Sequence, residues 1–165
     1  MHPCAQCAGL GPTCCERSEV LVTRGDIGRI ETHVGRNGFW ERKRVGDQSI
    51  LDQPDDLRFV QWGFDEQGAR RVLKRRENGA CTFLSVHGCT LPGHVRPLIC
   101  RLYPFRYTEG GLDGSDAHCP TELVPPGRTI LQVLDVRRVE AETWHRQLYH
   151  ELQTEWQQHA HRDDL

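Results

Sequence analysis

The sequence holds little apolar material for its length. Of its 165 residues, 37% are hydrophobic and 7% are aromatic, whereas globular chains carry roughly 45–50% apolar residues when glycine is included. No apolar stretch approaches the ~18 residues needed to span a bilayer, and the N-terminus lacks the basic start and apolar core of a signal peptide. These absences predict one cytoplasmic domain with no membrane partner and a thin core that needs an additional cross-link.

An excess of charge of either sign is also missing. The 21 basic and 23 acidic residues give a net charge of −2, so no global basic field points to nucleic acid. Two short basic runs remain, Arg70-Arg71 and Lys74-Arg75-Arg76, and such runs usually lie on a solvated face near the end of a strand or helix. Nucleic acid is therefore not an expected partner.

Familiar catalytic and cofactor motifs are absent as well. The chain has no glycine-rich GxGxxG turn for S-adenosylmethionine, no HExxH pair and no Ser-His-Asp series. Too few residues precede Cys4 for the buried strand that a thioredoxin-type redox pair requires. A c-type haem site would need histidine where Ala8 stands, and neither the ferredoxin run nor the radical-SAM triplet is present. These motifs therefore leave open whether the protein is an enzyme.

Cysteine, by contrast, is abundant. A CxxC pair near the N-terminus is followed by two adjacent cysteines, and the other cysteines come later in the chain. Because the cytoplasm keeps thiols reduced, they indicate metal binding rather than disulfide bonds. Thiolates favour zinc, copper(I) and iron–sulfur clusters, and a CxxC turn lets two sulfurs converge on one ion. The predicted metal ligands are Cys4, Cys7, Cys14, Cys15, Cys81, Cys89, Cys100 and Cys119.

The adjacent pair suggests more than one metal site. Neighbouring side chains of an extended chain point to opposite sides, so Cys14 and Cys15 are expected to serve different sites. Two ions, or one cluster and one ion, would then share the eight thiolates.

The excess negative charge of so many thiolates calls for nearby hydrogen-bond donors. Arg96 and Arg101 are predicted to supply them close to the metal, whereas Arg106 is expected to be ordinary surface charge. His87 and His118 stand near cysteines in the sequence and are alternative ligands, because imidazole also suits zinc and iron.

Local signals predict short elements around the cysteines. Thr23, with an acidic residue three positions later, is typical of the N-cap of a helix over residues 24–33 that ends at a glycine. Pro97 and Pro104 bracket a helix of about two turns that carries Cys100. The other expected elements are strands at Glu19–Val22 and Cys81–Leu84, a turn at His87-Gly88, extended pieces and turns over 36–67, and a turn-rich loop over 110–115.

A long amphipathic helix is expected to close the chain. Thr129 can cap it, and its apolar stripe, spaced by three and four residues, should pack on the core. The stripe consists of Ala141, Trp144, Leu148, Leu152 and Trp156. His145 and His150 are expected to face solvent or a partner, and the polar tail from 157 onward should fray.

These elements predict an α+β fold: a small, irregular, metal-stapled domain with short strands, a few helices and the long C-terminal helix. Residues 1–125 would form the cysteine-cluster domain. Residues 126–165 would form the C-terminal helix, packed on that same domain.

The order of the motifs resembles a known family. Cys4-x2-Cys7, Cys14-Cys15, Gly88-Cys89 and the run Arg96-Pro97-Leu98-Ile99-Cys100-Arg101-Leu102-Tyr103-Pro104-Phe105 resemble the YkgJ-like cysteine-cluster proteins. The resemblance covers residues 4 to about 120 and implies a zinc- or iron-chelating domain with all eight cysteines as candidate ligands. The interval between Cys7 and Cys14 is longer than in the family pattern. A related cluster in the longer flagellin lysine N-methylases implies an iron–sulfur centre that serves methyl transfer.

Three functions from different classes remain in view. The first is a protein that binds an iron–sulfur cluster or zinc, in a structural, electron-transfer or metal-handling role. The alternative is a cluster-dependent enzyme, a methyltransferase or oxidoreductase with an open metal position near Arg96 and Tyr103. The third is a zinc-stapled adaptor that binds a protein or nucleic acid through residues 70–76.

Overall fold

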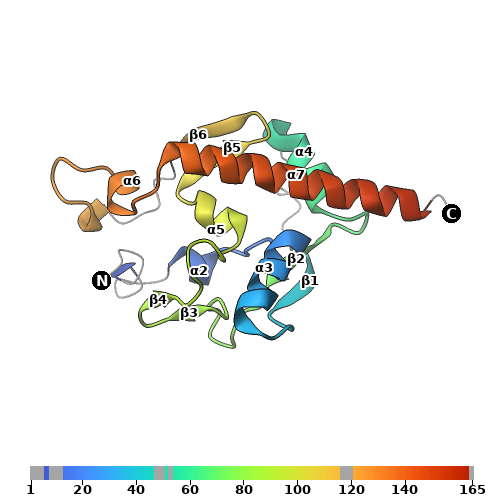
Figure 1. The fold of residues 1–165 in the computed structure, drawn as a ribbon, viewed down its shortest axis with the longest axis horizontal. Coiled ribbons are helices and arrows are strands. Elements are labelled where there is room, and N and C mark those ends of the chain that lie inside the picture. The colour runs from blue at the N-terminus through green and yellow to red at the C-terminus, as the bar shows by residue number, and fades with distance from the viewer. Residues whose placement is uncertain (1–5, 8–12, 47–50, 52–53, 116–120, 164–165) are drawn as a thin grey trace.

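The fold is built around one long helix and small two-stranded antiparallel sheets (Figure 1). The computed structural model describes residues 6–7, 13–46, 51, 54–115 and 121–163. In chain order the elements are α2 (Cys14–Arg17), α3 (Arg24–Val34), β1 (Trp40–Arg44), η2 (Pro54–Asp56), α4 (Leu57–Gly63), β2 (Ala69–Leu73), β3 (Leu84–Ser85), β4 (Gly88–Cys89), α5 (Leu98–Leu102), β5 (Phe105–Thr108), β6 (Gly111–Ser115), η3 (Thr121–Leu123), α6 (Ile130–Val133) and α7 (Arg138–Asp163). The predicted α+β class is confirmed.

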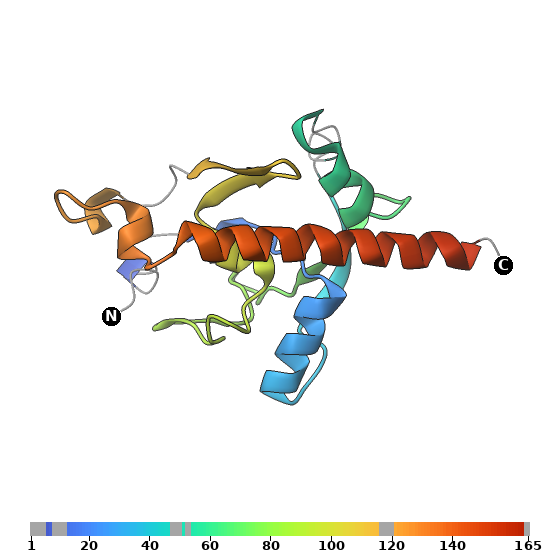
Figure 2. The same cartoon turned by 45° about the horizontal axis from the view of Figure 1, so that its top comes forward.

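Helix α7 runs across most of the length of the molecule in Figures 1 and 2. It packs against α5 and α4. Ala141, Leu148 and Leu152 on its inner side are fully buried and meet Leu98 and Leu102 of α5 in one hydrophobic cluster. The predicted packing of the stripe is confirmed for these residues. Trp156, which was also predicted to be in the stripe, is instead 38% exposed.

A second hydrophobic cluster lies between α3 and the strands that follow it. Ile30 of α3, Phe39 and Phe83 belong to it, and the two phenylalanine rings lie 5.5 Å apart. Strands β1 and β2 pair antiparallel along their full length, with Trp40 opposite Leu73 at one end of the sheet. This cluster matters for function because several cysteines border it.

The segment predicted as a strand at Glu19–Val22 is extended and lies along β2. Val22 N–H donates to Arg71 O at 3.0 Å, and Leu73 N–H donates to Val20 O at 2.9 Å. Only Leu21 is paired as a β-bridge, with Val72. The prediction was therefore correct in conformation, although this segment is a bridge rather than a full strand.

Helix α3 begins and ends as the sequence predicts. Thr23 Oγ1 accepts Asp26 N–H at 2.9 Å, and Asp26 Oδ2 accepts Thr23 N–H at 3.2 Å, which completes a capping box. At the other end, Gly35 adopts a left-handed conformation with φ of 66°, which a residue with a side chain adopts only with strain.

Polar side chains tie α3 to α5 and α7. Glu151 of α7 accepts hydrogen bonds from the Thr23 hydroxyl and from Arg29 Nη1, the latter at 2.8 Å. Asp26 is fully buried, and its Oδ1 accepts Leu98 N–H at 3.0 Å and Arg29 Nη2 at 2.7 Å. The start of α5 is thus fixed by a charged group on α3, which α7 supports in turn.

The middle of the chain is more regular than expected. The region 36–67, for which only extended pieces and turns were predicted, contains β1 and α4. Asp56 caps α4, because its Oδ1 accepts Phe59 N–H at 3.0 Å. Residues 111–115 form strand β6, paired with β5, instead of a loop. The predictions were therefore wrong for α4 and for β6, because a capping contact and cross-strand pairing override the high glycine and charge content, whereas β1 is an extended piece as expected.

The C-terminal region also differs from its prediction. Thr129 caps α6 rather than the long helix, with its hydroxyl accepting Gln132 N–H at 3.3 Å. Asp135, with φ of 53°, has a left-handed backbone conformation and interrupts the helical chain before α7 begins. Helix α7 then continues to Asp163, past the point where fraying was expected, and His159 on this last part lies 3.2 Å from the Arg24 guanidinium.

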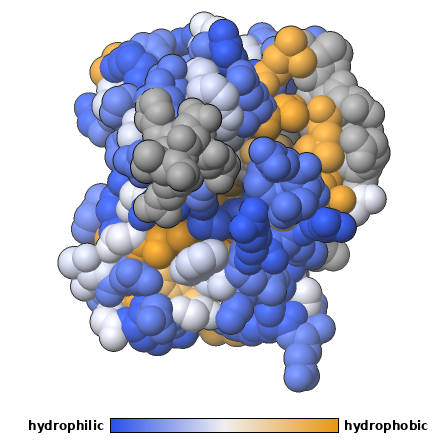
Figure 3. All heavy atoms as spheres, turned by 90° about the vertical axis from the view of Figure 1, so that its right-hand side faces the viewer, coloured by the Kyte–Doolittle hydropathy of each residue, from blue (hydrophilic) through white to orange (hydrophobic). Residues whose placement is uncertain are grey.

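Much of the surface is polar. The face seen in Figure 3 is mostly hydrophilic, with hydrophobic side chains gathered at its upper right and in a smaller group left of its centre. Among the described residues, the exposed large hydrophobic side chains are Leu57, Val86, Val139 and Trp156. No helix in this part of the chain is long and apolar enough to cross a membrane.

Candidate metal centre

Cys14 and Cys15 lie on a short helix rather than on an extended chain. Thr13 is the N-cap of α2, and its N–H donates to Glu16 Oε2 at 2.7 Å in a capping box. Successive residues of a helix are about 100° apart instead of opposite, and the two thiols are joined by a hydrogen bond. The premise that the chain is extended at this pair is therefore wrong. Their assignment to different metals stays a prediction.

Cys81 follows a tight turn and is held against α2. It is buried, and its N–H donates to Cys15 O at 2.9 Å. The Cys81 sulfur accepts a backbone hydrogen bond from Phe83. Hydrogen bonds of this kind favour the thiolate form and also stabilise sulfur ligands of metal centres.

The turn expected at His87-Gly88 is present and returns the chain toward Cys81. Strands β3 and β4 pair Leu84 with Cys89 and Ser85 with Gly88. Residues 81–84, predicted as a strand, instead contain a turn, and Cys81 is bridged only to Arg75. The expected return of Cys89 toward Cys81 is nevertheless confirmed, since Cys81 belongs to one hydrophobic cluster and Cys89 packs against it.

Cys100 lies on α5, as predicted. Pro97 is the N-cap of this helix and Tyr103 is its C-cap, so the two prolines do bracket it. The Cys100 side chain is half-buried and packs against the hydrophobic cluster of α3 rather than against α7. In Figure 1, α5 lies between α7 and the layer that contains α2, β3 and β4.

Four thiols from separate parts of the chain therefore border one hydrophobic cluster. Cys81 belongs to it, and Cys15, Cys89 and Cys100 pack against it. The electrostatic influence of Cys14 reaches Cys15 and Cys100. The folded chain thus places thiols that are far apart in sequence around one hydrophobic cluster.

The environment of these thiols disfavours their ionised forms. The hydrogen bond to Cys14, followed by burial and by the charges of neighbouring cysteines, raises the pKa of Cys15. Burial is the main cause that raises the pKa of Cys100 and of Cys81. Without a cation these three thiols are therefore protonated at neutral pH, and a divalent metal that displaces the protons would remove the repulsion between thiolates. The donor set fits a soft metal in this respect.

Not every predicted ligand can be placed. Cys4 and Cys119 lie outside the described residues, as does His118. Cys7 is described and half-buried, and His87 is exposed at the β3–β4 turn. Within the described ranges, no three His, Cys, Asp or Glu side chains lie close enough together to hold a metal ion, so the ligand set stays a prediction.

Arg96 and Arg101, the predicted donors to the metal centre, make their hydrogen bonds to backbone carbonyls. Arg101 Nε donates to Arg96 O at 2.7 Å and its Nη2 to His94 O at 2.5 Å, while Arg96 Nε donates to Leu91 O at 3.0 Å. Both guanidinium groups therefore brace the backbone before α5, although Cys100 still acts electrostatically on Arg101. Their predicted role as donors to the metal centre is untested.

Arg75 and Arg76 are the positive groups that lower the pKa of Cys81, opposing the effect of its burial. Arg75 donates to backbone carbonyls of α2 and of the turn before Cys81. Arg76 Nη2 donates to Thr82 O at 3.1 Å and also to Leu84 O. The sequence did not predict a role for these two residues. Nothing in a basic run distinguishes an arginine that donates to backbone carbonyls from the exposed Lys74 beside it.

The rest of the basic run is also used internally. Arg70 is paired with Glu19 at 3.8 Å and Arg71 with Glu155, and both arginine side chains are largely buried. The expectation of a solvated basic face is therefore wrong for Arg70 and Arg71. These ion pairs also weaken the case for an adaptor that binds through residues 70–76.

One histidine on α7 differs from its prediction. His145 is buried, and its Nε2 lies 2.6 Å from Thr108 O. Its ring also packs on Tyr149, with centroids 4.8 Å apart. It is therefore a core residue between α7 and the β5–β6 sheet, whereas His150 is exposed as expected.

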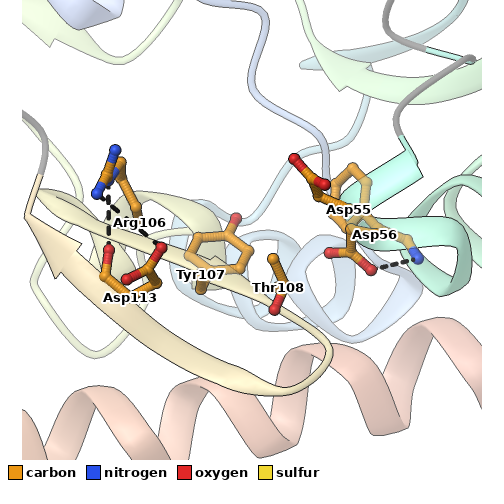
Figure 4. Close-up of a pocket in the computed structure, with 7 residues that line it drawn as sticks. Asp55, Asp56, Arg106, Tyr107, Thr108 and Asp113 are labelled. Carbon is orange, nitrogen blue, oxygen red and sulfur yellow. Dashed lines mark hydrogen bonds and ion pairs between the residues drawn. The ribbon is translucent and has the colours of Figure 1, made fainter.

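A cavity of about 350 Å³ lies between the start of α4 and the β5–β6 hairpin. Figure 4 shows Asp55 and Asp56 on one side, and Arg106 and Asp113 on the other, with Tyr107 between them. Arg106 is exposed and lies 3.9 Å from Asp113, which confirms that it is surface charge. The cavity is separate from the cysteine-bearing helices and turns.

Comparison with known proteins supports the chemistry of the cysteines. The model of the CxxCxxCC family, described as "Putative zinc- or iron-chelating domain", matches residues 3–120. This range includes every cysteine of the chain. No curated protein and no solved structure matches the chain.

Proposed function

The chain belongs to the CxxCxxCC family, and from this premise we propose that it binds zinc or iron through its cysteine thiolates. The observation that carries the proposal is the gathering of Cys15, Cys81, Cys89 and Cys100 on one hydrophobic cluster. Thiols from three separate segments border this cluster, although burial, followed by the charges of neighbouring cysteines, raises the pKa of Cys100. A bound metal would account for this arrangement, because it would stabilise the thiolates and link the segments that bear them.

The residues that would hold the metal are these four cysteines, together with Cys4, Cys7, Cys14 and Cys119. When bound, zinc would act as a structural cross-link, and an iron–sulfur centre would add the capacity to transfer one electron. The role of the protein itself is structural, electron-transferring or metal-handling. The proposal includes a reducing compartment, such as the cytoplasm, because oxidation to disulfides would remove the ligands.

The chain's own residues prepare the site in two ways. Backbone hydrogen bonds fix the positions of the segments that bear the thiols, as in the contact of Cys81 N–H with Cys15 O at 2.9 Å. The apolar side chains of Phe83, Ile30 and Phe39 border the thiols and limit the access of water, which strengthens the interaction between thiolate and cation.

Serine substitutions test the proposal. Cys81→Ser and Cys100→Ser should each lower the amount of zinc or iron retained per chain, because a hydroxyl is a far weaker ligand for these metals than a thiolate. Val86→Ala, at an 82% exposed position in the β3–β4 turn, is the matched control and should retain as much metal as wild type. Elemental analysis after anaerobic purification is the measurement.

The same samples separate the two metals. A zinc protein is colourless, whereas an iron–sulfur protein is brown and releases acid-labile sulfide. Full metal occupancy in both serine variants would contradict the proposed ligands, and a wild-type protein without either metal would contradict the function.

A further inference from the structure

Arg75 occupies an unusual place next to the candidate metal centre. It follows β2 and forms an antiparallel bridge with Cys81. Its guanidinium points back across this bridge toward α2, the helix of Cys14 and Cys15. The side chain is therefore placed between two segments that are more than fifty residues apart in sequence.

One guanidinium contacts three backbone carbonyls. Nη1 donates to Glu16 O at 2.7 Å and to Gly79 O at 2.8 Å, and Nη2 donates to Ser18 O. Glu16 and Ser18 lie at the C-terminal end of α2, where carbonyl groups have no partner within the helix. Gly79 belongs to the turn that leads to Cys81, with φ of 82°.

We propose that Arg75 is the positioning residue that holds the Cys14–Cys15 helix against the Cys81 turn, so that thiols from both segments can bind metal together. This inference rests on the metal-binding function proposed above. One backbone hydrogen bond, from Cys81 N–H to Cys15 O, joins α2 directly to the Cys81 turn. The fork of Arg75 adds contacts to the C-terminal end of α2 and to the same turn, which restricts the movement of one relative to the other.

The charge of Arg75 acts in the same direction. The positive group lies beside the bridge that Arg75 forms with Cys81, where a metal-bound thiolate would carry negative charge. The group is half-buried, so screening by solvent is weaker than at the surface. Its two effects, position and charge, are separable by substitution.

Lys74 provides a matched control. It is adjacent in sequence, carries the same charge and is exposed. Its backbone N–H donates to Phe39 O at 2.9 Å, and its backbone carbonyl accepts Thr82 N–H at 3.1 Å. Lys74→Met keeps both backbone contacts and removes one positive charge, which is also what Arg75→Met does to the net charge.

The experiment compares wild type, Arg75→Met, Arg75→Lys and Lys74→Met, each loaded with zinc. Zinc affinity is measured by competition with a chromophoric chelator. Alkylation of each cysteine in the loaded protein is followed by mass spectrometry, which reports separately on Cys14, Cys15 and Cys100. Spectra of the cobalt-substituted proteins report on the geometry at the metal, which a change in overall stability alone would not move.

We expect Arg75→Met to bind zinc about 10–100-fold more weakly, as losses of residues that support metal ligands commonly do. Cys14 and Cys15 should become reactive while Cys100 keeps its wild-type protection, and the cobalt spectrum should change. Arg75→Lys should be intermediate, because an ammonium restores charge without the fork. Lys74→Met should be indistinguishable from wild type.

Several results would overturn the inference. Equal behaviour of Arg75→Met and Lys74→Met would show that Arg75 positions nothing. Full recovery in Arg75→Lys would reduce its role to charge. Equal exposure of Cys100, or loss of helical signal in Arg75→Met, would assign Arg75 to the whole fold instead. If wild type binds no zinc or iron, the metal-binding function fails first and the inference fails with it.

Discussion

Gly25 offers a sensitive test of the contact that joins α3 to α7. A Cβ atom built on Gly25 would lie 2.6 Å from Glu151 Oε1, whereas one built on Gly28 would meet nothing within 4 Å. Gly25→Ala must therefore displace the Glu151 carboxylate from the Thr23 hydroxyl and from Arg29. Gly28→Ala changes the same helix without touching α7.

The two substitutions should have opposite signs. Exchange of glycine for alanine within a helix stabilises a protein by roughly 0.5–1 kcal/mol, so Gly28→Ala should gain about that amount. Displacing Glu151 weakens hydrogen bonds to a charged group, which contribute roughly 1.5–3 kcal/mol. Gly25→Ala should therefore lower the free energy of unfolding by about 1–2 kcal/mol after the helical gain is subtracted.

Denaturant unfolding of the metal-loaded protein measures both effects. The double variant with Glu151→Ala separates the clash from other consequences, since Gly25→Ala should become stabilising once the carboxylate is removed. Equal stabilisation by Gly25→Ala and Gly28→Ala in the wild-type background would refute the reasoning, because Glu151 would then not lie over Gly25.

The remaining predictions concern the buried polar groups around α7. Asp26→Ala should destabilise the protein by about 1–3 kcal/mol, because it leaves the N–H groups of Thr23 and Leu98 without the buried carboxylate that accepts them; the urea midpoint measures this loss. Tyr149→Phe removes the hydroxyl that donates to buried Asp56 and should lower the free energy of unfolding by about 1–3 kcal/mol, whereas an unchanged midpoint would place this hydroxyl in water. Burial raises the pKa of Glu151, but hydrogen bonds, chiefly from Arg29, lower it to below its ordinary 4.5 overall. Its stabilising effect is therefore complete above that pH and is lost as the pH falls through the folded-state pKa, so Glu151→Gln should flatten the acid side of the stability curve relative to wild type.

Local signals in the sequence identified the elements whose ends depend on near neighbours. The capping box of α3 and the two prolines around α5 involve residues only a few positions apart, so pattern alone predicts them. The same holds for the turn between β3 and β4, where a glycine and a short hairpin return the chain.

Elements that depend on distant partners were not predictable in this way. Strand β6 exists because β5 pairs with it, and Gly111 and Gly114 within it indicate a turn on their own. The burial of His145 depends on the β5–β6 sheet, with Thr108 supplying the hydrogen-bond partner. A single sequence contains no information on which of many polar residues meets such a partner.

The candidate site shows the same division. Cysteine spacing pointed to the chemistry and to the family, and the model of that family matches residues 3–120. The charged groups near the thiols were predicted less well, because Arg75 and Arg76 reach them only through the turn before Cys81. The position of a side chain that depends on how a loop folds can be found only from the structure.

The metal content of the purified protein tests the central claim most directly. Wild-type protein, prepared anaerobically and freed of loosely bound ions, should retain at least one equivalent of zinc or iron per chain, as measured by elemental analysis. Retention is expected because structural thiolate sites bind zinc with apparent energies of roughly 10–16 kcal/mol. A folded protein that retains neither metal, and takes up neither when it is supplied under reducing conditions, would contradict the account.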